Sequence, residues 1–202
     1  MIAIIDYGMG NIHSVQKALE SMGAQTFVTN KPEDIKACDK AVLPGVGAFG
    51  DAMAEIEKQK LGRVIKEHIK KNKAFLGICL GMHLLFDSSE ESPGIKGLSI
   101  LKGTVKKFQP QNTMKVPHMG WNQLRKVTGE CPLFKEMPDN SYVYFCHSYY
   151  PEPKDTSVIA ATTDYVIDFT SIVWKDNVYG VQFHPEKSQS AGLKMLENFV
   201  KL

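Results

Sequence analysis

The ten residues GICLGMHLLF, Gly77 to Phe86, contain the change of hydrophobic period that decides the fold. Before the change, Ala74 to Ile78 form a short continuous apolar run, which is typical of a fully buried strand in a parallel sheet. After Cys79, leucine recurs at helical spacing. Cys79 is therefore predicted to lie at the corner between a strand and a helix.

The small residues around this corner predict a reactive cysteine. Gly77, Cys79 and Gly81 have the G-x-C-x-G form of a nucleophile elbow, whose glycines let the strand and the helix pack closely around a sharply turned nucleophile. The start of the helix would favour a thiolate, because its free N–H groups and its dipole attract negative charge. The alternative is that Cys79 is a small buried hydrophobic residue, since glycines also flank many packed corners.

Outward from the corner, the first half of the chain alternates between strands and helices. Strands are predicted at residues 2–6, 26–29, 41–43 and 74–79. One helix is predicted between Asn11, a capping residue, and Gly23, and two more over about residues 51–71. This alternation indicates right-handed βαβ units, hence an α/β fold with a mostly parallel sheet and helices on both faces.

The second half is predicted to be rich in β-strands that are broken by turns. Strands are expected at residues 103–108, 142–149, 157–163, 170–175 and 178–183, followed by a helix over 191–202. We expect these strands to be antiparallel and to extend one edge of the parallel sheet. A length of 202 residues fits one domain, so residues 1–202 are predicted to form a single unit.

Composition argues against several classes of function. Lys and Arg total 24 against 22 Asp and Glu, which does not indicate nucleic acid as the main partner. The basic run at residues 66–73, which includes His68, is predicted to be a solvated helix face. The apolar stretch at the start is far too short for export or for spanning a membrane. Four cysteines without C-x-x-C pairing indicate a reducing cytoplasm.

A nucleophilic cysteine needs a base, and the base needs an orienting group. His184 follows a predicted strand in the sequence VQFHPEKS, and Pro185 favours an extended backbone at His184. Because residues two apart in an extended segment point to the same side, Glu186 is predicted to reach the histidine ring and hold its tautomer. The alternative is a surface turn without a catalytic role.

His83 is the rival base, because Cys79, His83 and Asp87 are spaced as one face of a helix. Cys79 lies at the corner, however, and not inside the helix, so its side chain need not share that face. We therefore expect His83 to form a wall of the site. His13 has no evident carboxylate partner.

An acyl-transfer site also needs hydrogen-bond donors for an oxyanion. The backbone N–H of Leu80, directly after the nucleophile, is one natural donor. The loop PGVGAFG, residues 44–50, follows the third strand and is expected to supply another, the alternative being a plain glycine turn. The sequence YGMGNIH, residues 7–13, has only two glycines of a dinucleotide-binding fingerprint, and no acidic residue ends the second strand, so dinucleotide binding is disfavoured.

Taken together, PGVGAFG, GICLGM and QFHPEKS resemble the class I glutamine amidotransferases. The resemblance implies a flavodoxin-like sheet and a Cys-His-Glu triad that works without a cofactor or a metal. Cys79 would attack the carboxamide of L-glutamine, His184 would deliver a proton to the leaving ammonia, and Glu186 would orient His184. Water would then hydrolyse the thioester to glutamate.

The same resemblance implies where the substrate is held. The backbone at Val46, Gly47 and Leu80 would surround the oxyanion. Position 83 departs from the family pattern, which usually has Gln there, but an imidazole can still donate or accept one hydrogen bond. The residues expected to bind glutamine are Gly47, His83, His147 and Ser148.

Three further stretches, IIDYGMGNIHSV, HMGWN and YFCHSYY, resemble the branch of this family whose glutaminases are separate subunits. This implies a heterodimer with a barrel-shaped cyclase subunit, which uses the ammonia to make an imidazole ring in histidine biosynthesis. Asn11, Trp121 and Lys187 are expected to face that partner, although a buried core position would suit Trp121 equally. Two alternatives stay open: a related glutaminase serving a synthase with another sugar-derived acceptor, and an inactive scaffold or thiol sensor.

Overall fold

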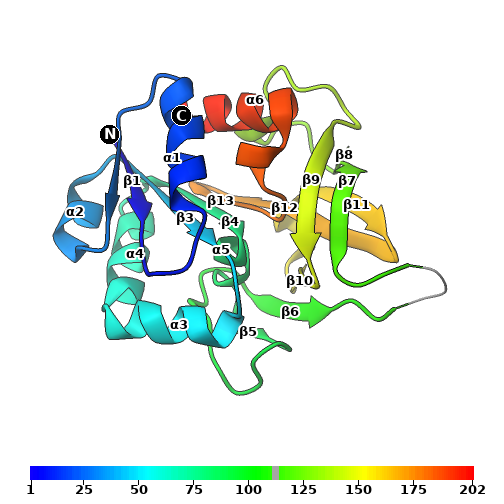
Figure 1. The fold of residues 1–202 in the computed structure, drawn as a ribbon, viewed down its shortest axis with the longest axis horizontal. Helices are drawn as coiled ribbons and strands as arrows, with labels where there is room; N and C mark the ends of the chain where they lie inside the picture. The colour runs from blue at the N-terminus through cyan, green and yellow to red at the C-terminus, as the bar shows by residue number, and fades with distance from the viewer. Residues whose placement is uncertain (111–113) are drawn as a thin grey trace.

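A mixed sheet forms the centre of the computed structural model, which describes residues 1–110 and 114–202 (Figure 1). In these residues the sheet has eight strands in the order β2-β1-β3-β4-β13-β12-β11-β8. The strands are β1 (Ile2–Ile5), β2 (Thr26–Thr29), β3 (Lys40–Gly45), β4 (Ala74–Cys79), β8 (Arg125–Lys126), β11 (Ile159–Tyr165), β12 (Ile167–Lys175) and β13 (Val178–Val181).

The strands from β2 to β13 in this order run parallel, and β12, β11 and β8 continue the sheet as antiparallel strands. This confirms the predicted α/β class, with a flavodoxin-like parallel sheet that is extended by antiparallel strands. In an open parallel sheet, the carboxyl ends of neighbouring strands meet at one edge, where ligands bind. The ends of β3, β4 and β13 therefore lie side by side.

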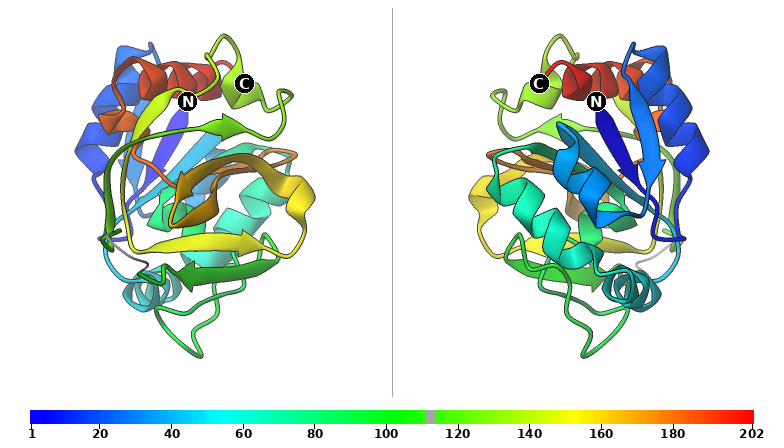
Figure 2. Two further views of the ribbon diagram at one scale, coloured as in Figure 1. Left: turned by 90° about the vertical axis from the view of Figure 1, so that its right-hand side faces the viewer. Right: turned by 90° about the vertical axis from the view of Figure 1, so that its left-hand side faces the viewer.

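Helices cover both faces of the sheet, as predicted (Figure 2). Ile4 packs into the core beneath one group of helices, whereas its neighbour Ile5 packs into the core on the opposite face. The alternation explains why β1 is apolar throughout: both faces of the strand are buried. One face carries α1 (Ile12–Ser21) and α6 (Gln189–Val200), and the other carries α2 (Pro32–Ala37), α3 (Phe49–Lys58) and α4 (Leu61–Lys70).

Within the residues that the structure describes, two smaller sheets flank the main one, so the expectation that the later strands all extend the parallel sheet is wrong. The predicted strand at 142–149 is interrupted at Ser148, and its two parts pair with different partners. One sheet has the order β10-β6-β5, from Tyr149–Pro153, Gly103–Lys107 and Ser88–Ser89, and the other pairs β7 (His118–Gln123) with β9 (Tyr142–His147). The remaining short elements are α5 (Leu80–His83) and the 3-10 turns η1 (Pro132–Phe134), η2 (Thr156–Val158) and η3 (Pro185–Lys187).

One side chain in the basic helix is placed differently from the prediction. His68 is buried, with its Nδ1 3.1 Å from the carbonyl oxygen of Ile35 and its Nε2 3.3 Å from that of Ala74. Its position four residues after Val64 puts it on the apolar stripe of α4, not on the solvated face. Among the described residues, no helix is long and apolar enough to cross a membrane.

Candidate active site

The predicted nucleophile elbow is present at the end of β4. Cys79 has φ +53° and ψ −111°, a strained conformation for a residue with a Cβ atom. Glycine is needed on both sides of it. A Cβ at Gly81 would lie 1.8 Å from the carbonyl oxygen of Leu43 in β3, and one at Gly77 would lie 2.7 Å from that of Gly81. The close approach of β3, β4 and α5 therefore positions the thiol at the carboxyl edge of the sheet.

His184 and Glu186 reach the same edge from the end of β13. Strand β13 pairs in parallel with β4, so the residues that follow it emerge beside Cys79. His184 Nδ1 lies 3.0 Å from Glu186 Oε1, and the two side chains are 6% and 0% exposed. The predicted contact is present, but its geometry differs from the prediction: only His184 is extended, and Pro185–Lys187 forms the turn η3, which brings Glu186 back to the ring.

The surroundings of His184 favour the charged form of its ring. Burial alone would lower the pKa of His184, but its hydrogen bonds and charge interactions with Cys79 and Glu186 outweigh burial and raise the pKa to about 10. Since Glu186 engages Nδ1, Nε2 is the nitrogen that remains for the sulfur. An imidazolium at this position stabilises a thiolate.

A cavity of about 260 Å³ lies in front of Cys79, a volume that suits an amino acid better than a larger ligand. Gly47, with φ +94°, contributes backbone that a residue with a side chain would adopt only under strain. Val46, the other expected oxyanion residue of this loop, is not part of the lining, and its side chain is 45% exposed. The lining consists of Gly47, Cys79, Leu80, His83, Glu91, Pro117, Cys146, His147, Ser148 and Tyr149.

His83 forms a wall of this cavity and is held as a neutral ring. Its Nε2 lies 2.7 Å from Gln182 Oε1, and burial lowers the pKa of His83 to about 4. The proposed helical face that joins it to Asp87 does not exist, because α5 ends at His83. Asp87 instead accepts hydrogen bonds from Lys102 and from the backbone N–H of Gly103.

Two residues near the thiol were not predicted. Gln182 bonds His83 through its oxygen, and its Nε2 lies 3.9 Å from Cys79 Sγ. The alternation in VQFH could have identified it, because Gln182 and His184 are two apart in an extended segment. Glu91, from the loop after β5, accepts a hydrogen bond of 2.8 Å from the N–H of Phe49 at the start of α3. No local pattern in the sequence indicates this long-range contact.

The three residues expected at a partner surface lie on, or next to, elements that contact the segments of the triad. Asn11 precedes α1, which contacts η3, and Lys187 is exposed within η3. Trp121 packs against Tyr144, with ring centroids 6.0 Å apart, and Tyr144 accepts the backbone hydrogen bond of His184. Trp121 is 45% exposed, which excludes the buried core position.

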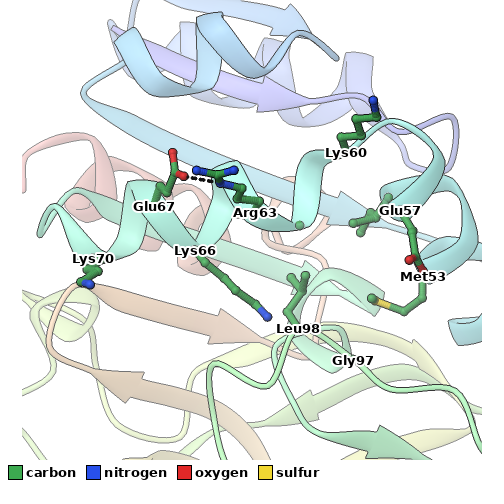
Figure 3. A pocket seen from close by; sticks show the side chains of 11 residues that line it. Met53, Glu57, Lys60, Arg63, Lys66, Glu67, Lys70, Gly97 and Leu98 are labelled. Carbon is green, nitrogen blue, oxygen red and sulfur yellow. Dashed lines mark hydrogen bonds and ion pairs between the residues drawn. The ribbon is translucent and has the colours of Figure 1, made fainter.

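A second hollow, of about 650 Å³, lies away from these residues, between α3, α4 and the segment at Gly97 and Leu98 (Figure 3). Its lining mixes both signs of charge, and Arg63 and Glu67 are paired with each other there. It contains neither a thiol nor a histidine, so it offers no acyl-transfer chemistry. In the described part of the chain, no group of three His, Cys, Asp or Glu side chains is arranged to hold a metal ion.

The fold and the site define a glutamine amidotransferase of class I. A family model described as "Glutamine amidotransferase class-I" matches residues 3–202. Two solved structures resemble the chain in fold. One, a glutamine amidotransferase, has a TM-score of 0.78 at 15% identity and covers 100% of this chain and 99% of its own. PurLQS from Thermotoga maritima has a TM-score of 0.74 at 17% identity and covers 99% and 97%.

Curated relatives narrow the family further. Imidazole glycerol phosphate synthase subunit HisH from Methanocaldococcus jannaschii is 49% identical over 204 residues and covers 100% of both chains. The subunit of the same name from Acinetobacter baylyi is 48% identical over 200 residues and covers 99% of this chain and 97% of its own. The chain therefore belongs to the class I glutamine amidotransferases and, within them, to the family of HisH subunits.

Proposed function

We infer that the chain is the glutaminase subunit of imidazole glycerol phosphate synthase, which hydrolyses L-glutamine to glutamate and ammonia. One observation carries the assignment of the reaction to this site. A cysteine on a strained elbow lies at the end of β4, beside the histidine that follows β13, and that histidine is itself held by a buried carboxylate. This is the nucleophile, base and orienting group that amide hydrolysis requires.

We propose that the three residues act in sequence. The Cys79 thiolate attacks the carboxamide carbon, and the negative charge moves to the oxygen. The imidazolium of His184 then gives its proton to the leaving nitrogen, so ammonia departs and a thioester remains. The neutral ring next takes a proton from water, which attacks the thioester, and the departure of the thiolate releases glutamate. Glu186 holds the ring in one tautomer and stabilises its charge throughout.

Binding and oxyanion stabilisation are proposed for the residues around the thiol. The backbone N–H of Leu80 follows the nucleophile, and the backbone at Val46 and Gly47 lies on the neighbouring loop, so both are candidates for donors to the oxyanion. Donors of this kind act most strongly in a site that excludes water. The glutamine side chain would enter the cavity between Gly47, His83, His147 and Ser148.

We propose that the ammonia passes to a cyclase subunit in a heterodimer that acts in the cytoplasm. The relatives' name describes a synthase subunit, and the surface beside the triad supports the docking of a protein. Met119, Trp121 and Tyr142 expose large apolar side chains on the β7–β9 ladder, at 62%, 45% and 57%. Exposed aromatic and Met side chains are typical of interface cores. All four cysteines are free thiols, which fits a reducing compartment.

The test is glutamate release from L-glutamine, measured with the chain alone and with a cyclase subunit that carries its nucleotide ligand. Cys79→Ala and His184→Ala should each reduce kcat by about a thousandfold or more, because each removes a group that makes or breaks a bond. His83→Ala should act mainly on KM. Activity near wild type in His184→Ala, together with its loss in His83→Ala, would show that the base is assigned wrongly.

A further inference from the structure

Four residues form a chain of hydrogen bonds that leads from the β7–β9 ladder into the wall of the cavity. Asn122 Nδ2 lies 3.4 Å from His118 Nε2, and His118 Nδ1 lies 3.1 Å from His147 Nε2. His147 Nδ1 lies 2.7 Å from the carbonyl oxygen of Tyr149. His118 and His147 are directly opposite each other in the ladder, so the backbone pairing sets the contact between their rings.

The last acceptor, the carbonyl oxygen of Tyr149, determines which nitrogen of each histidine ring carries the proton. A backbone carbonyl can only accept, so His147 must carry its proton on Nδ1. A neutral imidazole then has a lone pair on Nε2, and His118 must donate to it from its own Nδ1. His118 Nε2 is consequently an acceptor. Both rings are neutral at physiological pH, because burial lowers the pKa of His118 to about 4 and that of His147 well below its usual value.

The hydrogen bonds of Asn122, at the other end of the hydrogen-bond chain, agree with these protonation states. Asn122 Oδ1 accepts the N–H of Gln123 at 2.8 Å, and Asn122 Nδ2 donates to the carbonyl oxygen of Asp164 at 2.9 Å. These two bonds orient the amide so that its NH₂ group faces His118. Donors and acceptors therefore alternate without conflict from Asn122 to Tyr149.

Aromatic packing holds the ring of His118, in the middle of the hydrogen-bond chain, in place. His118 is 3% exposed and lies between two aromatic rings. Its centroid is 3.8 Å from that of Tyr165 at an interplanar angle of 16°, and 4.7 Å from that of Phe145 at 20°. A ring that is stacked on both faces and bonded at both nitrogens has one orientation available to it.

We propose that His118 is a positioning residue for glutamine, acting through His147 on the backbone of Ser148. The His147 ring bonds the carbonyl of Tyr149, so it bridges across Ser148 at the point where β9 gives way to β10. His147, Ser148 and Tyr149 all line the cavity, whereas His118 does not. Loss of the Nδ1 donor of His118 would leave His147 Nε2 buried without a partner, and the backbone at Ser148 would no longer be held in place. The inference rests on the proposed glutaminase function, because the position of Ser148 can affect KM only if the cavity binds glutamine.

A matched pair of substitutions separates the donor from the ring. In His118→Asn the side-chain NH₂ takes the place of Nδ1, whereas in His118→Gln it takes the place of Nε2. Both remove the stacked imidazole, but only His118→Asn can still donate to His147. For the full chain with a cyclase subunit, the KM for glutamine should rise about tenfold in His118→Gln and stay within about threefold of wild type in His118→Asn. The kcat should change by less than about twofold in both.

A purely structural role would give a different result. The two variants would then lose kcat or active sites to a similar extent, with Cys79 alkylation by iodoacetamide counting the intact sites. Equal KM values in the two variants, or a fall in kcat at constant KM, would overturn the proposal.

A measurement on the wild-type chain needs no variant. Nitrogen-15 NMR of the histidine rings should show His118 and His147 both protonated at Nδ1 and unprotonated at Nε2. His147 protonated at Nε2 would refute the hydrogen-bond chain, whether or not the protein hydrolyses glutamine. Correct tautomers in a chain that hydrolyses no glutamine with its cyclase would instead count against the proposed function.

Discussion

At the scale of single residues, Glu186 controls the charge of the site without touching the sulfur. Its side chain is fully buried, and within the described residues its Oε2 accepts no hydrogen bond. A buried carboxylate that is incompletely bonded is unfavourable unless a cation lies beside it. Glu186 therefore favours the imidazolium form of His184, the form that would protonate the leaving ammonia in the proposed mechanism.

This linkage predicts the pH dependence of the enzyme. With the pKa of His184 raised to about 10 from 6.5, the ring stays charged across the neutral range. Its contribution to folding stability is complete below pH 6.5 and is lost as the pH rises through about 10. Glu186→Gln should move the alkaline limb of the kcat/KM profile to lower pH by about one unit or more. Glu136→Gln, which removes a surface partner of Lys194, should leave the limb unchanged.

How far the sequence predicts the site depends on the distance over which each residue acts. The elbow at Cys79 and the contact of His184 with Glu186 were predicted because glycine spacing and a following proline are local signals. Gln182 was missed although a local alternation would have indicated it. The interaction of His118 with His147 was not predictable, because it depends on strand pairing across 29 residues.

At the scale of elements, the elbow depends on how closely α5 approaches β3. Gly81→Ala would place a Cβ atom 1.8 Å from the backbone oxygen of Leu43. Neither β3 nor α5 can move away freely, because both are packed in the core. We expect a loss of about 3 kcal/mol in the free energy of unfolding and a fall in Tm of roughly 6–12 °C. Calorimetry would measure this. Gly129→Ala is the matched control, since its Cβ would meet nothing within 4 Å. Equal Tm values for the two variants would contradict the close packing.

The elements themselves were predictable where apolar period and length agreed. The parallel strands and α1 were identified within one or two residues at most of their ends. Helix α2 was missed because only one of its residues, Ile35, is buried, so its apolar period is weak. The break at Ser148 was not predicted, because the alternating residues on its two sides read as one strand while each part pairs with a different sheet.

At the scale of the whole molecule, the exposed apolar ladder adjoins the triad, because the backbone N–H of His184 bonds the carbonyl oxygen of Tyr144 in β9. Trp121→Ala should weaken the proposed complex with a cyclase subunit by about 2 kcal/mol, roughly thirtyfold in Kd, because an exposed Trp is a typical interface anchor. Val28→Ala, at an exposed apolar residue on the opposite edge strand β2, is the control. Titration calorimetry would compare them. An unchanged Kd in Trp121→Ala would remove this face from the interface.

The place of β13 in the sheet determines when the enzyme can first become active during its own synthesis. This strand is inserted between β4 and β12, and Gln182, directly after it, is 103 residues along the chain from Cys79. A nascent chain that has left the ribosome as far as β12 already carries the thiol, but it lacks the histidine, the carboxylate and the strand that closes the centre of the sheet. Pairing of such separated strands is slow, because long loops must be closed first. On the proposed mechanism, the thiol therefore stays without its base until residues 178–202 have folded, and ammonia would be released only after that step.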